Sequence, residues 1–150
     1  MKGVFGLNNK TDLYKKLEWE YENLKKEPQN SFHAYNFFVT AWHLLEWKYP
    51  TDVEARKKIS GSVPLLQVCE HLAVGAKHFA PTNPKLDSVE GSKKSSVWGD
   101  GVWAEGAWKE GVWATWLAVS LTGDAQKEFG GTIKAHEFAT LVMEYWKNEI

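Results

Sequence analysis

A tryptophan repeat between Val97 and Trp116 places the strongest limit on how this chain can fold. The repeat sets Trp98, Trp103, Trp108 and Trp113 five residues apart. A step of five residues turns an α-helix through about 500°, so successive tryptophans would share no face of a helix, and in a flat strand they would alternate between its two sides. The first three pentads end in an acidic residue and a glycine, a pair that favours turns and bulges. The stretch therefore indicates neither a helix nor a long regular strand.

We expect the repeat to form a small β insert, residues 97–121, attached to a helical domain. Four pentads would complete about one coil of a solenoid, whereas repeat architectures need about three or more stacked units. The repeat runs into Ala114–Leu121, where side chains alternate as in a strand. Most of the tryptophans are expected to pack against the helical core. Indole rings also dominate protein interfaces, so Trp98, Trp103 and Trp108 are candidate interaction residues.

Outside the repeat, apolar residues recur at helical spacing, which predicts a mainly α fold. Residues 32–49 are apolar around most of a helix circumference, so we expect this segment to be the central helix, capped by Asn30 or Ser31. The predicted helices are Thr11–Lys26, Phe32–Tyr49, Thr51–Ser60, Pro64–Phe79 and a last helix capped by Thr132. The third of these is short and charged and opens with the capping pattern Thr51–Glu54. Residues 80–96 are predicted to be a loop and Thr122–Asp124 a turn. These elements predict one domain, residues 1–150, folded as a four- to five-helix bundle with a small β insert at roughly residues 96–122 before the C-terminal helix.

The composition excludes several classes of protein. The net charge is −1 and Arg56 is the only arginine, which argues against non-specific binding to nucleic acid. Cys69 is the single cysteine, so neither an internal disulfide nor a cysteine zinc cluster can form, and its place on an apolar helix face predicts a buried, inert thiol. There is no apolar run of about 18 residues and no recognisable signal peptide. We therefore expect a cytoplasmic protein without a membrane segment.

Two of the predicted apolar helices each carry one polar stripe. The stripe on the second helix comprises Asn36, Thr40, His43 and Trp47, and the stripe on the fourth comprises Gln67, His71 and His78 with Lys77 beside it. If the two helices pack antiparallel, as neighbours in small bundles often do, the stripes face each other across a shared seam. The members of this seam are the candidate ligand-binding residues.

Three interpretations of this seam stay open at the level of the sequence. Its side chains either satisfy one another in the core or along an exposed helix edge, or line a binding or catalytic pocket, or bind a metal ion. His71 and His78 lie about two helical turns apart, too far to bind one ion without another helix. We expect no metal site and no cofactor. No catalytic residue is assigned, although His71, His78 and His43 are the candidates for acid–base chemistry.

Parts of the chain resemble known proteins. The segments Ala34–Ala41 and His71–Phe79, AYNFFVTA and HLAVGAKHF, are similar to a group of uncharacterised bacterial helical proteins, and the resemblance covers nearly the whole chain. The Ala-Lys-His sequence that ends at His78 more distantly resembles the HEPN superfamily, helical dimers that include RNA-cleaving toxins and defence proteins. Active members of that superfamily carry Arg followed four to six residues later by His, whereas here no histidine follows Arg56 before His71. The resemblance implies a helical bundle and a homodimer but not the nuclease motif.

The leading functional hypothesis is a non-catalytic cytoplasmic binding or regulatory protein of bacterial or phage origin, in defence or counter-defence. Its expected partner is a nucleotide, another small molecule or a protein. No phosphate-binding glycine loop, serine elbow or catalytic triad supports an enzyme. The first alternative is a HEPN-like enzyme that processes RNA or nucleotides through His71 and His78. The second alternative is a structural protein that assembles through the tryptophan repeat.

Overall fold

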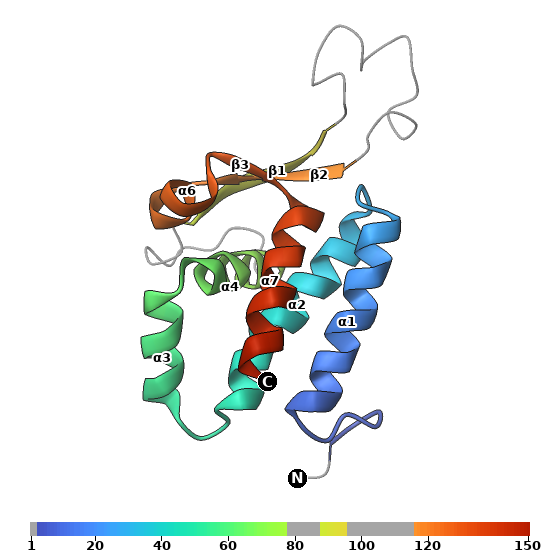
Figure 1. Ribbon diagram of the computed structural model, residues 1–150, viewed down its shortest axis with the longest axis vertical. Coiled ribbons are helices and arrows are strands. Elements are labelled where there is room, and N and C mark those ends of the chain that lie inside the picture. Colours follow the sequence, from blue (N-terminus) through green and yellow to red (C-terminus); the bar gives the residue numbers. More distant parts are fainter. Residues whose placement is uncertain (1–2, 78–87, 96–115) are drawn as a thin grey trace, which may run out of the picture.

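A computed structural model describes residues 3–77, 88–95 and 116–150 of the chain. The described part is mainly helical, with one three-stranded antiparallel sheet before the C-terminal helix (Figure 1). The helices are α1 (Lys10–Lys26), α2 (Ser31–Lys48), α3 (Val53–Ser62), α4 (Pro64–Lys77), α6 (Gly123–Phe129) and α7 (Ala135–Glu149), and the strands are β1 (Val89–Ser95), β2 (Trp116–Leu121) and β3 (Thr132–Lys134). The predicted fold class, a mainly helical protein with a small β part, is confirmed. The tryptophan repeat up to residue 115 lies outside the described residues.

Short polar side chains fix the starts of the first three helices. The side chain of Asn9 accepts hydrogen bonds from the first backbone N–H groups of α1, and that of Asn30 does the same for α2. Asp52 caps α3 by accepting a hydrogen bond from the N–H of Ala55 at 2.9 Å. Each cap satisfies N–H groups that have no partner inside the helix. Of the two residues predicted as alternative caps of α2, Asn30 is the cap and Ser31 is the first residue of the helix, whereas the cap of α3 is Asp52 rather than Thr51.

The core lies where α1, α2, α4 and α7 meet beneath the sheet (Figure 1). α2 contributes more buried side chains than any other described helix, as its apolar circumference predicts. The largest fully buried side chains include Trp146, Phe37, Phe138, Leu44 and Leu66. No helix in the described ranges is long and apolar enough to cross a membrane.

The sheet has the order β1-β2-β3, with both pairs antiparallel. Alternate residues of the central strand, Leu117, Val119 and Leu121, are buried against the helices. The N–H of Leu117 donates to the carbonyl oxygen of Pro28 at 2.9 Å, which ties β2 to the connection between α1 and α2. The sheet therefore covers one end of the helical layers.

The sequence predictions are wrong at three places around the sheet. Residues 89–95 were predicted as loop but form β1, and the turn expected at Thr122–Asp124 opens into α6. Thr132 begins β3, and α7 starts three residues later at Ala135. The sequence of β1, rich in Gly, Ser and Lys, has low strand propensity, and it is extended because its backbone pairs with β2. The sheet consequently includes residues before and after the predicted insert at residues 96–122, since its strands lie between Val89 and Lys134.

Candidate functional site

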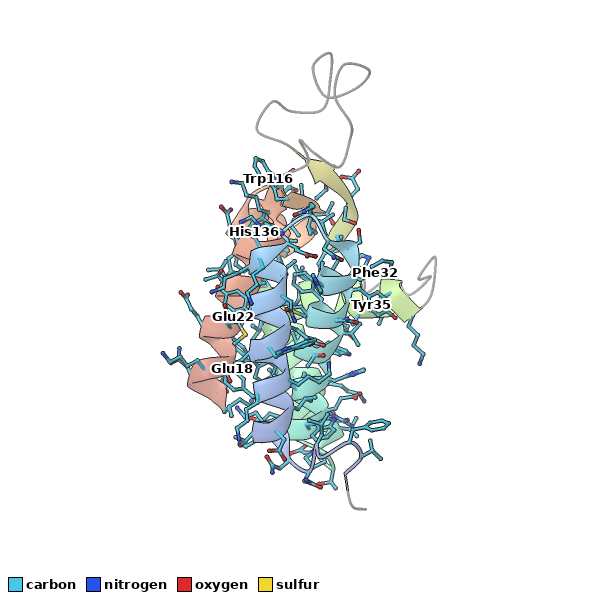
Figure 2. The ribbon with its side chains drawn as sticks, turned by 90° about the vertical axis from the view of Figure 1, so that its right-hand side faces the viewer. Glu18, Glu22, Phe32, Tyr35, Trp116 and His136 are labelled. Carbon is cyan, nitrogen blue, oxygen red and sulfur yellow. The ribbon has the colours of Figure 1, made fainter. Side chains whose placement is uncertain are left out.

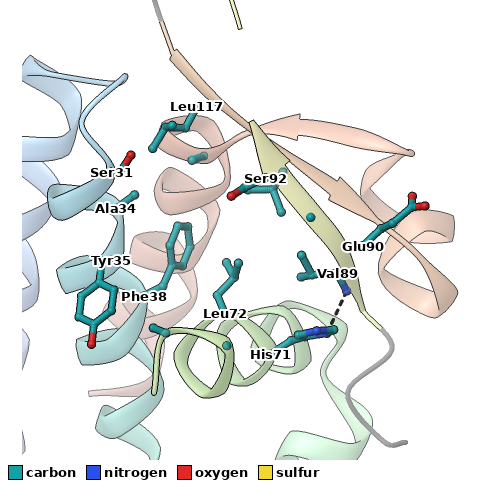
Figure 3. A pocket seen from close by; sticks show the side chains of 15 residues that line it. Ser31, Ala34, Tyr35, Phe38, His71, Leu72, Val89, Glu90, Ser92 and Leu117 are labelled. Carbon is teal, nitrogen blue, oxygen red and sulfur yellow. Dashed lines mark hydrogen bonds between the residues drawn. The ribbon is translucent and has the colours of Figure 1, made fainter. Parts of the chain in front are cut away.

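A cavity of about 400 Å³ lies between α2, α4 and the sheet (Figure 3). Five elements contribute to its walls: α2, α4, β1, β2 and the first residue of α7. The lining residues are Ser31, Ala34, Tyr35, Phe38, His71, Leu72, Gly75, Ala76, Val89, Glu90, Gly91, Ser92, Leu117, Val119 and Ala135. The walls are mostly apolar, with a few polar groups from serine, tyrosine, histidine and glutamate. This combination is typical of small-ligand sites.

The α2 wall of the cavity is one face of the helix. Ser31, Ala34, Tyr35 and Phe38 recur at i, i+3, i+4 and i+7, the spacing that aligns side chains along a helix. Phe38 is 4% exposed and forms the closed end, whereas Tyr35 is 49% exposed. Figure 3 shows the Tyr35 ring at the side of the cavity and the Phe38 ring between Tyr35 and Leu72. The cavity therefore opens to the surface beside Tyr35.

The β1 wall is formed by four consecutive residues, from Val89 to Ser92. Successive side chains of a strand point to opposite faces, so a cavity lined by consecutive residues borders the edge of the strand as well as one face. The register with β2 shifts between Val89 and Gly91, which makes Glu90 the extra residue of a β-bulge. Figure 3 shows the Glu90 carboxylate pointing away from the cavity.

His71 connects α4 to β1. The backbone N–H of Val89 donates a hydrogen bond to Nδ1 of His71 at 3.1 Å, drawn as the dashed line in Figure 3. A ring nitrogen that accepts a hydrogen bond carries no proton, so the imidazole of His71 has its proton on Nε2. The histidine thus holds the first residue of β1 in place at the wall of the cavity.

Thr40, the centre of the polar stripe on α2, faces α1 instead of α4. Its side chain is 4% exposed, and its hydroxyl accepts a hydrogen bond from Nζ of Lys16 at 2.7 Å. Lys16 also pairs with the buried carboxylate of Glu20, one helical turn further along α1. The expectation that the two polar stripes face each other is therefore wrong at this position, because α1 supplies the partners of Thr40.

The other predicted ligand residues are dispersed. Asn36, His43 and Lys77 are exposed, and Trp47 packs partly buried against the core. On α4, the side-chain amide of Gln67 donates to the carbonyl oxygen of Gly61 at 3.1 Å. His78, Trp98, Trp103 and Trp108 lie outside the described residues. Among the described ligand candidates, only His71 lines the cavity.

Sequence reasoning missed most of the cavity for two physical reasons. The face of α2 that carries Ala34, Tyr35 and Phe38 has helical spacing, but α2 is apolar almost all round, so periodicity could not show which face meets α4. The sequence predicts a loop at Glu90 and Ser92, because the residue types in this segment do not favour a strand.

Within the described residues, neither Cys69 nor a cluster of metal-binding side chains gives this site a reactive centre. Cys69 is fully buried, and burial raises the pKa of its thiol far above the ordinary range, which disfavours the reactive thiolate. No group of three or more His, Cys, Asp or Glu side chains within the described ranges could hold a metal ion. The arrangement is suited to holding a ligand.

Comparison with known proteins identifies no relative for this chain. No protein-family model, curated protein or solved structure matches it. Functional inference therefore rests on the geometry of the site.

Replacing His71 with alanine should lower the free energy of unfolding by about 1–3 kcal/mol, because the N–H of Val89 loses its acceptor. His71→Asn is the matched control, since an asparagine Oδ1 can accept in place of Nδ1. We expect urea denaturation to show a smaller loss for asparagine than for alanine. Equal losses would mean that the hydrogen bond to β1 contributes nothing measurable.

Proposed function

We propose that this protein is a non-catalytic binding protein whose site is the cavity between α2, α4 and β1. The observation that carries the proposal is the cavity itself. Its volume of about 400 Å³ falls within the range of about 300–1,000 Å³ that is usual for small-ligand sites. Its largely apolar lining with a few polar groups fits recognition of an apolar group whose orientation is set by hydrogen bonds.

The charges around the cavity restrict the ligand further. Glu90 is the one charged residue among the described lining residues, and no lysine or arginine lines the cavity within the same set. A nucleotide would bring phosphates to walls that hold no cationic side chain among the described lining residues. The described lining thus favours a neutral apolar group over a nucleotide.

Filling the cavity at Gly75 tests this proposal. Gly75 lines the cavity, and a Cβ atom added there meets nothing within 4 Å, so we expect a leucine side chain to extend into this open space. We expect Gly75→Leu to weaken binding of the neutral fluorescent probe N-phenyl-1-naphthylamine by about tenfold or more, since the apolar group loses its place. Fluorescence titration gives the affinity directly.

Gly61→Leu provides the matched control. Gly61 is also helical, its added Cβ also meets nothing within 4 Å, and it lies in α3, outside the cavity lining. Both substitutions remove a helical glycine, which stabilises a helix by up to about 1 kcal/mol. Only Gly75→Leu should change probe binding. Absence of binding to the wild type, or equal binding by both variants, would contradict the proposal.

An enzymatic role is the second candidate, because His71 lies at the wall of the cavity. This candidate is a HEPN-like activity on RNA or nucleotides in which His71 and His78 act together. Its test is turnover of RNA by the wild type and by His71→Asn, which keeps an acceptor for β1 and removes the imidazole. Absence of wild-type turnover, or turnover that survives this substitution, would exclude the assignment.

The remaining parts of the functional hypothesis also stand as proposals. They are a role in bacterial or phage defence or counter-defence, and assembly as a homodimer or through the tryptophan repeat. Sedimentation velocity across a range of protein concentrations tests assembly, and a monomer at all concentrations would contradict it.

A further inference from the structure

We propose that the ligand of this cavity is an extended peptide that adds as a fourth strand to the outer edge of β1 and inserts an apolar side chain into the cavity. The proposal rests on the proposed function, because it assumes that the cavity binds a ligand. It goes further in naming the ligand as a polypeptide and in assigning its backbone a partner.

Among the described elements, the sheet has a free edge at β1. β1 is an edge strand, and among the described elements no strand pairs with its outer side, which lies at the margin of the molecule in Figure 2. Edge strands display unpaired N–H and C=O groups and are a common place for peptide addition.

The hydrogen bonds of β2 show which groups of β1 point outward. The N–H groups of Leu117 and Leu121 donate to Pro28 and Gly131, on the side of β2 away from β1. The direction of the backbone N–H and C=O groups alternates along an antiparallel strand, so the N–H and C=O of Val119 also point away from β1. Ser92 of β1 lies opposite Val119, and the two residues form a non-hydrogen-bonded pair. The backbone N–H and C=O of Ser92 therefore point to the outer edge of β1. A peptide can pair with both groups.

The edge of β1 before Ser92 is arranged differently. The backbone N–H of Val89 also points outward, but it already donates a hydrogen bond to Nδ1 of His71 at 3.1 Å. The bulge at Glu90 separates this occupied position from Ser92. Bulges bend a strand and often lie beside functional sites. β1 is thus anchored at one end, and beyond the bulge its outer edge pairs with no strand in the part of the chain that the structure describes.

The cavity and a side chain paired to the edge at Ser92 would lie on the same side of the sheet. Ser92 lies opposite Val119, whose side chain is 3% exposed and faces the helices. A peptide residue paired beside Ser92 would place its side chain on this same face, where Ser92 itself lines the cavity. Figure 2 shows Phe32 and Tyr35 on the side of the molecule where β1 lies, and these rings are 80% and 49% exposed. They extend the apolar contact beyond the cavity.

The charge of Glu90 defines the neighbouring residue of the peptide. The Glu90 carboxylate points away from the cavity, toward the opposite face of the strand (Figure 3). Because strand side chains alternate, the residue next to the apolar one would lie on the Glu90 side. A lysine or arginine there is complementary in charge. The partner is therefore an extended segment in which a basic residue follows or precedes the apolar one on the side of Glu90. The neighbour on the other side would lie beside Lys93 of β1 and carries no requirement for charge.

The probe for this proposal is the acetylated, amidated heptapeptide Thr-Thr-Lys-Phe-Lys-Thr-Thr, with versions that carry Leu, Ile, Trp or Ser at the centre. We expect binding with an apolar centre and at least about tenfold weaker binding with serine. N-methylation of each peptide bond in turn leaves the protein unchanged, and at one or two positions it should weaken binding by about tenfold, because a strand hydrogen bond is lost. Uniform tolerance of N-methylation would overturn strand addition.

Two protein variants complete the test. Ser92→Pro removes the outward N–H without removing a hydrogen bond to β2 and should weaken peptide binding by about tenfold, whereas Ser92→Thr should not. Glu90→Lys should weaken the Lys-Phe-Lys peptide and favour its Glu-Phe-Glu counterpart. Thermal unfolding checks that each variant is folded, and the N-methylated peptides decide the question if Ser92→Pro is not.

The outcomes separate this inference from the proposed function. If N-phenyl-1-naphthylamine binds in a Gly75-dependent manner but no peptide of the set displaces it, the cavity is a small-ligand site and the peptide inference is wrong. If neither the dye nor any peptide binds, both proposals fail. A dimer that Ser92→Pro dissociates would show that the edge of β1 binds a second copy of the chain, which also overturns the peptide proposal.

Discussion

Replacing Phe138 with alanine should lower the free energy of unfolding by about 3–5 kcal/mol, the usual cost of removing a buried phenyl ring. Phe138 of α7 is fully buried. Its ring centroid lies 6.0 Å from that of Phe38 on α2 and 5.2 Å from that of Phe129 on α6, the latter in an edge-on arrangement. One ring therefore joins three helices, and its loss also removes the support behind Phe38 at the closed end of the cavity.

Chemical denaturation with two control variants checks this expectation. Phe138→Leu keeps most of the apolar volume and should cost less than half as much as alanine. Phe32→Ala removes the same ring from a position that is 80% exposed and should change stability by at most about 0.5 kcal/mol. Similar losses for Phe138→Ala and Phe32→Ala would show that the aromatic cluster does not hold the helices together.

The helices were predictable because their signals are local. Asn30 has a short polar side chain directly before an apolar periodic run, and prolines at positions 28 and 50 bound that run. These features act within a few residues, and tertiary contacts reinforce them. The limits of α1 and α2 consequently agree with the structure within about a residue or two.

β1 and the cavity were not predictable, because their signals come from distant residues. The segment Gly91–Ser95 is extended because β2 pairs with it. His71 was singled out for its position on a helix, but its role depends on the N–H of Val89, eighteen residues away. Thr40 was assigned to the wrong neighbour because both α1 and α4 pack against the apolar α2, and only the structure shows which one supplies a lysine.

Lys16→Met should lower the free energy of unfolding by about 2–4 kcal/mol, because it leaves a buried carboxylate without its charged partner. Glu20 is 4% exposed and pairs through Oε1 with Nζ of Lys16, while its Oε2 has no hydrogen-bond partner among the described residues. The same Nζ donates to the hydroxyl of Thr40 at 2.7 Å. The Lys16 side chain is 40% exposed, so water partly replaces the lost ammonium and keeps the cost below that of a fully enclosed pair.

A double-mutant cycle isolates this interaction. Lys16→Met combined with Glu20→Met removes both charges and should recover most of the stability that Lys16→Met loses, because no buried charge remains. Lys15→Met is the matched control, since Lys15 is exposed and adjacent in the sequence, and it should change stability by at most about 0.5 kcal/mol. If Lys16→Met cost no more than Lys15→Met, the carboxylate of Glu20 would be accommodated without Lys16. The polar stripe of α2 would then contribute nothing to the packing of α1, and Thr40 would be available to another partner.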